Sequence, residues 1–147
     1  MTESKTTAPP RLLILLAASA LGVSATGQAS AQARAKADAS CRPAGATLQY
    51  DCTVKLIDAR TKEPLAGASV TVGADMPSMP MAHNIRPAKA APAAEPGAYE
   101  VRLELEMHGD WALRIDVVGP VRDRVIVPLR FEDKVVRPSR SAPPRGR

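Results

Sequence analysis

A strict alternation of apolar and charged residues over positions 98–107 constrains most strongly how this chain can fold. Successive side chains of a β-strand point to opposite faces, so a period of two predicts a strand with one face in a core and the other in water. The apolar residues that share one phase are Tyr99, Val101, Leu103 and Leu105. The residues between them are charged and would face solvent.

The same alternation recurs in other short stretches that are separated by turn-forming residues. Residues 111–119 set Trp111 in phase with Leu113 and Ile115, which predicts a second half-buried strand with Trp111 in the core. Runs rich in β-branched and apolar residues predict further strands. These runs are 52–58, 68–74 and 125–131.

Several short strands with few helical patterns predict an all-β fold, namely a small antiparallel β-sandwich. The compact connection 108–110 predicts that 98–107 and 111–119 pair as a hairpin. One long connection remains, over 75–97, and it holds five prolines. Long ordered loops are uncommon in compact domains and are often functional, so this Pro/Met-rich loop is the first candidate for a site.

The N-terminal segment 1–31 has the organisation of a secretory signal peptide. Lys5 and Arg11 precede an apolar run over 12–23, and residues 29–31 (Ala-Ser-Ala) form a small-x-small cleavage site. The apolar run falls short of the roughly 20 residues that span a bilayer, although an uncleaved membrane anchor is the alternative. We therefore expect a periplasmic or secreted protein that does not span a membrane once the signal peptide is removed.

The rest of the chain is long enough for one domain. An Ala-rich, polar stretch over 32–49 predicts a flexible lead-in, 50–133 contains the predicted strands, and 134–147 predicts a disordered basic tail. Residues 32–133 hold 13 Lys and Arg against 14 Asp and Glu, and the tail carries five further basic residues and no acidic ones. A domain without a basic surplus gives no support for nucleic-acid binding.

The two cysteines, Cys41 and Cys52, allow a single intramolecular pairing. An exported chain reaches an oxidising compartment, where a disulfide persists, so we expect these residues to form one. Chain-entropy arithmetic for so short a loop gives about 2–3 kcal/mol of stabilisation. The alternative is a thiolate metal site, which would want more cysteines or a tighter spacing.

The segment 75–84 (DMPSMPMAHN) concentrates methionine and histidine in a chain that has only five methionines and two histidines. It holds Met76, Met79, Met81 and His83. Met76 and Met79 each precede a proline, which favours extended or polyproline conformations. From Met79 onward a period of two would place Met79, Met81 and His83 on a common face. Thioethers and an imidazole gathered in this way predict a site for copper(I), which is a soft ion.

Met107 and His108 form a second cluster of the same residue types, at the predicted turn after 98–107. One metal site could draw on both segments if that turn and the long loop lie at the same end of the sandwich. The alternative is that the methionines only fill space, because methionine is an adaptable core residue. In that case their sulfur atoms would lie between the sheets and would not face solvent.

Three spaced motifs give the chain a resemblance to the YtkA-like or FixH-like domains. The motifs are Met79-Pro80-Met81-Ala82-His83, Pro96-Gly97-Ala98-Tyr99 and 105–111 (LEMHGDW). The resemblance covers about residues 50–133 and implies an immunoglobulin-like β-sandwich outside the cytoplasm. It also implies a link to copper handling and to the assembly of respiratory oxidases. FixH itself carries a membrane anchor, and this chain is similar to it only in part.

Two functions from different classes are therefore open. The first is a periplasmic module that binds copper(I) and holds it or delivers it to a periplasmic or membrane cuproprotein, such as a respiratory oxidase or an efflux system. Its candidate ligands are Met76, Met79, Met81 and His83, with Met107 and His108 as weaker candidates. The second is a metal-free sandwich that binds a protein partner through its long loop. We do not expect an enzyme, because no Ser-His-Asp order is recognisable and the acidic residues alternate outward on strands.

Overall fold

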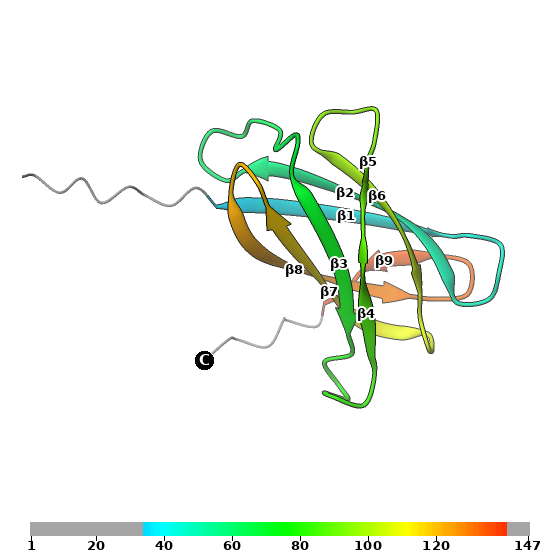
Figure 1. Cartoon of the computed structure of the whole chain (residues 1–147). Helices are drawn as coiled ribbons and strands as arrows, with labels where there is room; N and C mark the ends of the chain where they lie inside the picture. Colours follow the sequence, from blue (N-terminus) through cyan, green and yellow to red (C-terminus); the bar gives the residue numbers. More distant parts are fainter. Residues whose placement is uncertain (1–33, 141–147) are drawn as a thin grey trace, which may run out of the picture. The chain divides into compact units, whose positions relative to one another are not determined.

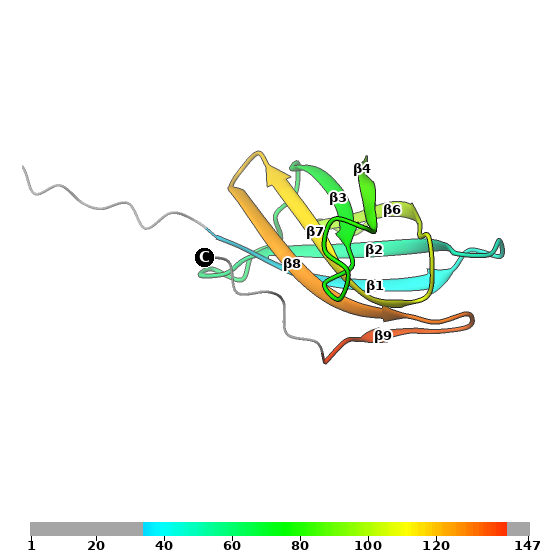
Figure 2. The ribbon, with the colours of Figure 1, turned by 90° about the horizontal axis from the view of Figure 1, so that it is seen from below.

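The computed structural model describes residues 34–140, which form nine β-strands in two antiparallel sheets (Figure 1). The first sheet has the order β1 (Ala35–Pro43), β2 (Gln49–Asp58), β6 (Ala98–Glu104) and β5 (Ala91–Pro92). The second sheet has the order β4 (Asn84–Lys89), β3 (Ser69–Asp75), β7 (Gly109–Val118), β8 (Arg122–Phe131) and β9 (Val136–Pro138). In Figure 2 the strands β3, β7 and β8 of the second sheet run obliquely across β1, β2 and β6 of the first. The predicted all-β sandwich is confirmed.

The core lies between the sheets and is built by the residues of one phase in each long strand. In β6 the apolar residues of the alternation are buried, while the charged residues between them are exposed. In β7 Trp111 is buried in phase with Leu113 and Ile115, as predicted. The rings of Tyr50 and Phe131, one from each sheet, meet edge to face with 4.8 Å between their centroids. The two inner faces therefore interdigitate, as sandwich packing requires.

The predicted hairpin between 98–107 and 111–119 is wrong, because β6 and β7 belong to different sheets. β6 pairs with β2 and β5, while β7 pairs with β3 and β8. A period of two shows that a strand is half-buried, and in a sandwich the strands of both sheets meet that condition equally. Residues 105–108 therefore form a corner that carries the chain from one sheet to the other, with Leu105 buried in the core.

The sandwich extends beyond the predicted boundaries of 50–133 at both ends. The predicted flexible lead-in, 32–49, contains β1, which pairs with β2 along its whole length. Small residues alternate with polar ones in β1, so the stretch carries a weak hydrophobic signal. The small residues are Ala35, Ala37, Ala39 and Cys41. The predicted disordered tail, 134–147, contains β9, which pairs with the end of β8.

Cys41 and Cys52 form a disulfide, as predicted. They face each other directly in the register between β1 and β2, with 4.0 Å between their Cα atoms. Both thiols are used in this bond, so the alternative of a thiolate metal site does not apply. The bond fastens β1, an edge strand whose inward residues are small, to the strand beside it.

Two predictions concern the ends of the chain, beyond residues 34–140. The predicted signal peptide, 1–31, and the last residues of the predicted tail, 141–147, lie outside the described residues. Within residues 34–140, no helix is long and apolar enough to cross a membrane.

Candidate functional site

The segment 75–97, predicted as one long connection, contains two strands. β4 pairs with β3 as a hairpin, and β5 pairs with β6 in the other sheet. Residues 76–83 join β3 to β4 and are called the hairpin tip below. The N–H of Met76 donates to the carbonyl oxygen of His83 at 3.2 Å and closes this tip. The methionine-rich sequence therefore forms the end of a hairpin, at the bottom of Figure 1.

Two consecutive β-turns shape the hairpin tip. The N–H of Met79 donates to the carbonyl oxygen of Met76 at 3.0 Å, and the N–H of Ala82 donates to that of Met79 at 3.2 Å. Each turn has a proline at its second position, where the fixed φ of proline is favoured. Met81 follows at the third position of the second turn and has a φ of +70°. The predicted strand-like period of two over 79–83 is therefore wrong, because the chain turns here instead of continuing as a strand.

The methionines of the hairpin tip divide into one buried residue and two exposed ones. Met76 is 3% exposed and belongs to the core, where its Cε lies 3.2 Å from the position that a Cβ on Gly109 would occupy. Met79 is 37% exposed and Met81 is 94% exposed. Space filling therefore accounts for Met76, but it does not account for Met79 and Met81.

The corner 105–108 lies beside the hairpin tip. Nδ1 of His83 and Oε2 of Glu106 are 2.5 Å apart, so a hydrogen bond joins the two segments. The next residue along the corner, Met107, is 39% exposed, and His108 is also exposed. Both segments that contain candidate ligands thus lie at the same end of the sandwich.

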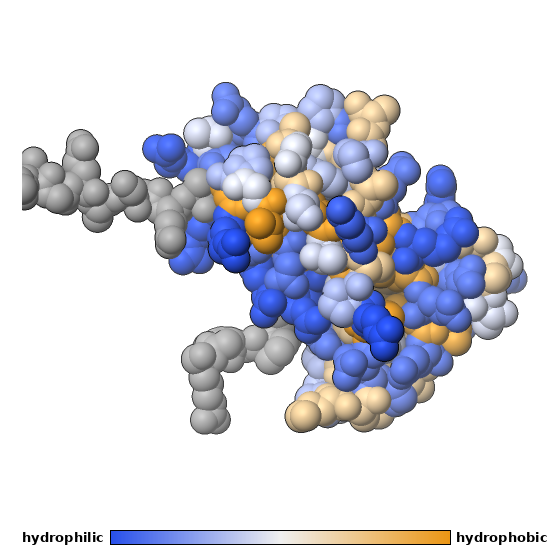
Figure 3. Space-filling model, viewed as in Figure 1, coloured by the Kyte–Doolittle hydropathy of each residue, from blue (hydrophilic) through white to orange (hydrophobic). Residues whose placement is uncertain are grey.

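This end of the sandwich exposes methionine side chains. Among residues 34–140, six large hydrophobic side chains are exposed, and half of them are Met79, Met81 and Met107. Figure 3 shows moderately hydrophobic surface at the hairpin tip, at the bottom of the view. In this part of the chain no group of three or more His, Cys, Asp and Glu side chains could hold a metal ion. A metal bound here would therefore depend on thioether sulfur, which selects soft ions such as copper(I).

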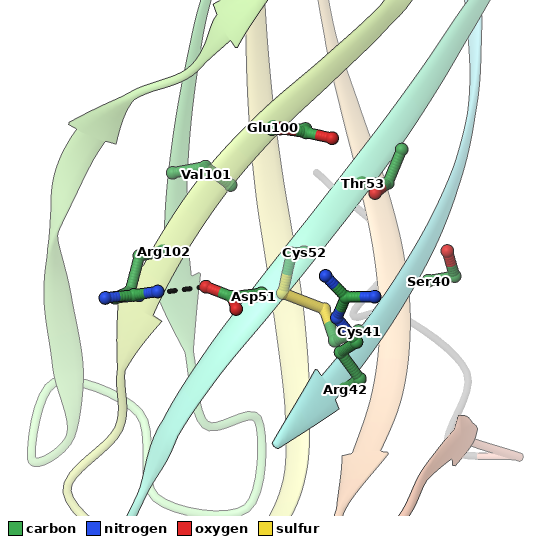
Figure 4. A pocket seen from close by; sticks show the side chains of 9 residues that line it. All are labelled: Ser40, Cys41, Arg42, Asp51, Cys52, Thr53, Glu100, Val101 and Arg102. Atoms are coloured by element: carbon green, nitrogen blue, oxygen red, sulfur yellow. Dashed lines mark hydrogen bonds and ion pairs between the residues drawn. A yellow bond between two sulfur atoms is a disulfide. The ribbon is translucent and has the colours of Figure 1, made fainter. Parts of the chain in front are cut away.

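A shallow hollow lies elsewhere, on the outer face of the first sheet over β1, β2 and β6 (Figure 4). Its charged side chains form a row across these three strands, in which Arg42 and Arg102 flank Asp51. Nε of Arg102 donates to Oδ1 of Asp51 at 2.8 Å, and this hydrogen bond holds the pKa of Asp51 below its usual range. Opposite charges thus alternate along the row and support strand pairing, and we assign no binding site to it.

The strands that carry the hairpin tip and the corner 105–108 lie in the part of the chain that matches a known family. The YtkA-like family model matches residues 42–116, from the end of β1 into β7. The chain belongs to the YtkA-like family. In this YtkA-like domain the matched region includes the hairpin tip and the corner 105–108. Searches of curated proteins and of solved structures found no significant match to the chain.

Two of the three motifs behind the resemblance have structural roles in this YtkA-like domain. Gly97 has a φ of +78°, and its carbonyl oxygen accepts a 2.8 Å hydrogen bond from the N–H of Leu56. The hydroxyl of Tyr99 donates to the carbonyl oxygen of Leu65 at 2.6 Å. The motif 105–111 places its leucine and its tryptophan in the core. The methionines and the histidine of the remaining motif are not explained by packing.

Glu106 was not predicted from the sequence as a member of the site. The alternation over 98–107 places this residue on the outer side, and it is 23 positions away from His83. No local pattern pairs an imidazole with so distant a carboxylate. Only the meeting of the corner with the hairpin tip brings the two side chains together.

Proposed function

We propose that this YtkA-like domain works outside the cytoplasm as a copper(I)-binding module that holds or delivers the ion. The proposed ligands are Met79, Met81, Met107 and His83, with His108 as a further candidate. Met76 is left out because its side chain is committed to the core.

The exposure of the methionines is the observation that carries this proposal. Single exposed apolar side chains are normal on a protein surface, but a gathering of them marks an interaction site. Met79, Met81 and Met107 contribute little to the core, and they lie in two adjoining segments. A role in binding gives a physical reason for methionine at these positions.

Copper(I) is the ion that this donor set fits best. Thioether and imidazole donors suit soft and borderline ions, whereas magnesium and calcium require oxygen ligands. Thioethers cannot be lost to disulfide formation, so such ligands remain available in an oxidising compartment. The Cys41–Cys52 bond supports an oxidising location, because disulfides are rare in the cytosol.

A copper(I) titration against a colorimetric chelator tests the proposal. The purified, oxidised protein should withdraw one copper(I) from the chelator. Met79→Ala and His83→Ala should each weaken copper(I) binding without lowering the melting temperature, because neither side chain belongs to the core. Met76→Ala is the matched control: it should keep the copper(I) affinity of the folded protein while lowering the free energy of unfolding by about 2–5 kcal/mol.

The competing function is a metal-free module that binds a protein partner through the same surface. Methionine side chains adapt to many apolar partners, so the exposed group at the hairpin tip and corner also fits this role. A wild-type protein that leaves all copper(I) with the chelator would reject the metal proposal and favour this alternative.

A further inference from the structure

We infer that Glu106 is a positioning residue that fixes the ring of His83 so that Nε2 is presented to the metal ion. This inference rests on the proposed copper(I) site and assigns a role to a residue outside the ligand set. It also makes the corner 105–108 and the hairpin tip two halves of one site.

The hydrogen bond between the two side chains determines which tautomer His83 adopts. Oε2 of Glu106 lies 2.5 Å from Nδ1 of His83. A carboxylate only accepts hydrogen bonds, so Nδ1 carries the hydrogen atom and donates it. In the neutral ring Nε2 then keeps a free lone pair, which is what a metal ion requires.

Packing does not account for this pair. The side chain of Glu106 is 54% exposed and that of His83 is 31% exposed. Exposed pairs of this kind contribute little to the stability of a fold. Histidines that bind metals, in contrast, almost always donate their other ring N–H to a carboxylate, a carbonyl oxygen or water. The observed pair supplies that partner.

The corner holds Glu106 in place from both sides. Before it, Leu105 is buried in the core, and its N–H donates to the carbonyl oxygen of Leu48 at 2.9 Å. After it, the carbonyl oxygen of Met107 accepts a 3.1 Å hydrogen bond from Nε1 of Trp111. The backbone that carries Glu106 is therefore anchored, which is what a group that orients a ligand needs.

Nitrogen-15 NMR of the metal-free protein tests the orientation without copper. At a pH where the ring is neutral, His83 of the wild type should show the Nδ1–H tautomer. Glu106→Ala should shift His83 towards the Nε2–H tautomer, and Glu106→Gln, whose amide oxygen still accepts, should shift it less. Glu104→Gln is the matched control, because Glu104 is exposed on the same outward phase of the chain. An unchanged tautomer in Glu106→Ala would overturn the inference.

Copper(I) affinity provides the second measurement. Glu106→Ala should weaken copper(I) binding by about 10–100-fold, which is the usual effect of losing such a partner. Glu106→Gln should lose less affinity, and Glu104→Gln should lose none. Equal affinities of Glu106→Ala and the wild type would overturn the inference while the proposed function stands. A wild type that binds no copper(I) would instead refute the proposed function, and with it the metal role of Glu106.

Discussion

The N–H of Leu56 donates a 2.8 Å hydrogen bond to the carbonyl oxygen of Gly97, and a Cβ on Gly97 would lie 2.8 Å from the carbonyl oxygen of Leu56. The backbone of the turn before β6 thus lies close beside Leu56 of β2, and its hydrogen bond continues the pairing of β2 with β6. Gly97 also has a φ of +78°, a conformation that residues with a Cβ rarely adopt. This point of contact therefore leaves no room for a side chain.

Comparing alanine substitutions at Gly97 and Gly45 should separate the effect of a steric clash at the Cβ position from the effect of the positive φ. Gly97→Ala should lower the free energy of unfolding by about 2 kcal/mol or more, because it adds a backbone clash to the left-handed strain. Gly45→Ala is the control, since Gly45 has a φ of +88° and no atom lies within 4 Å of the position that a Cβ would occupy there. Urea unfolding of both variants measures the difference, and equal losses would contradict the close approach.

Met81 occupies a position that suits glycine better than methionine. It has a φ of +70° and is 94% exposed, so Met81→Gly should relieve backbone strain without removing core contacts. We expect the free energy of unfolding to rise by about 1 kcal/mol or less, because glycine also makes the unfolded chain more flexible. Thermal unfolding measures this change. A fall in stability larger than the entropic cost of glycine, about 1 kcal/mol, would mean that the Met81 side chain packs against the fold.

Trp111 should be a major contributor to stability. It is buried in the core, and its indole N–H donates to the carbonyl oxygen of Met107. Trp111→Ala should therefore lower the free energy of unfolding by about 3–5 kcal/mol. Val118→Ala, on the exposed phase of the same strand, should change it little. Denaturant titration followed by circular dichroism gives both values, and a mild effect of Trp111→Ala would argue against its place in the core.

The Cys41–Cys52 bond should be present in the protein purified without reductant and should stabilise β1. Mass spectrometry after alkylation without reductant should find no labelled cysteine. The double variant Cys41→Ser, Cys52→Ser should lose about 2–3 kcal/mol of stability, the loop-entropy value for so short a loop. Two labelled cysteines in the purified protein would count against the disulfide.

Asp58 should make the domain sensitive to acid. Hydrogen bonds from the backbone N–H groups of Thr61 and Arg60 hold the pKa of Asp58 below its usual range. A carboxyl group with a lower pKa in the folded state stabilises the fold above its unfolded pKa, and this contribution disappears as the pH falls through the folded pKa. Stability should therefore decline from about pH 4 downward.

Asp58→Asn separates this effect from other titrations. The asparagine keeps an oxygen that can accept the same two hydrogen bonds, but it carries no charge to lose. Urea midpoints measured at several acidic pH values should fall less steeply for the variant than for the wild type. Parallel curves would show that Asp58 is not a source of the acid sensitivity.

The strands with large apolar residues were predictable, because burial follows from the local period of two. The alternation around Leu103 and around Leu113 marked both strands correctly. Strand pairing was not predictable in the same way, because β6 finds its partner β2 far away in the sequence. β1 was missed because small residues such as Ala37 and Ala39 give almost no hydrophobic signal.

At the candidate site, residue types were predictable but geometry was not. The concentration of methionine and histidine marked the hairpin tip. Two proline turns shape it, however, and place Met81 at a positive φ, while Met76 continues the inward phase of Ala74 in β3. The partner of His83 could not be found from local patterns, because the long-range pairing of β7 with β3 is what brings Glu106, just before β7, to the hairpin tip at the end of β3.

The corner between β6 and β7 has a consequence for the order in which this chain folds. Tyr50 of β2 pairs with Leu103 of β6, and Val72 of β3 pairs with Ile115 of β7, so both sheets depend on distant partners. Such pairings form slowly, because the entropy of closing a long loop is lost before the contacts form. The β3–β4 hairpin is local and can form early. The contact of Glu106 with His83 requires the long-range pairing of β7 with β3, so the site we propose is completed only after the second sheet has formed.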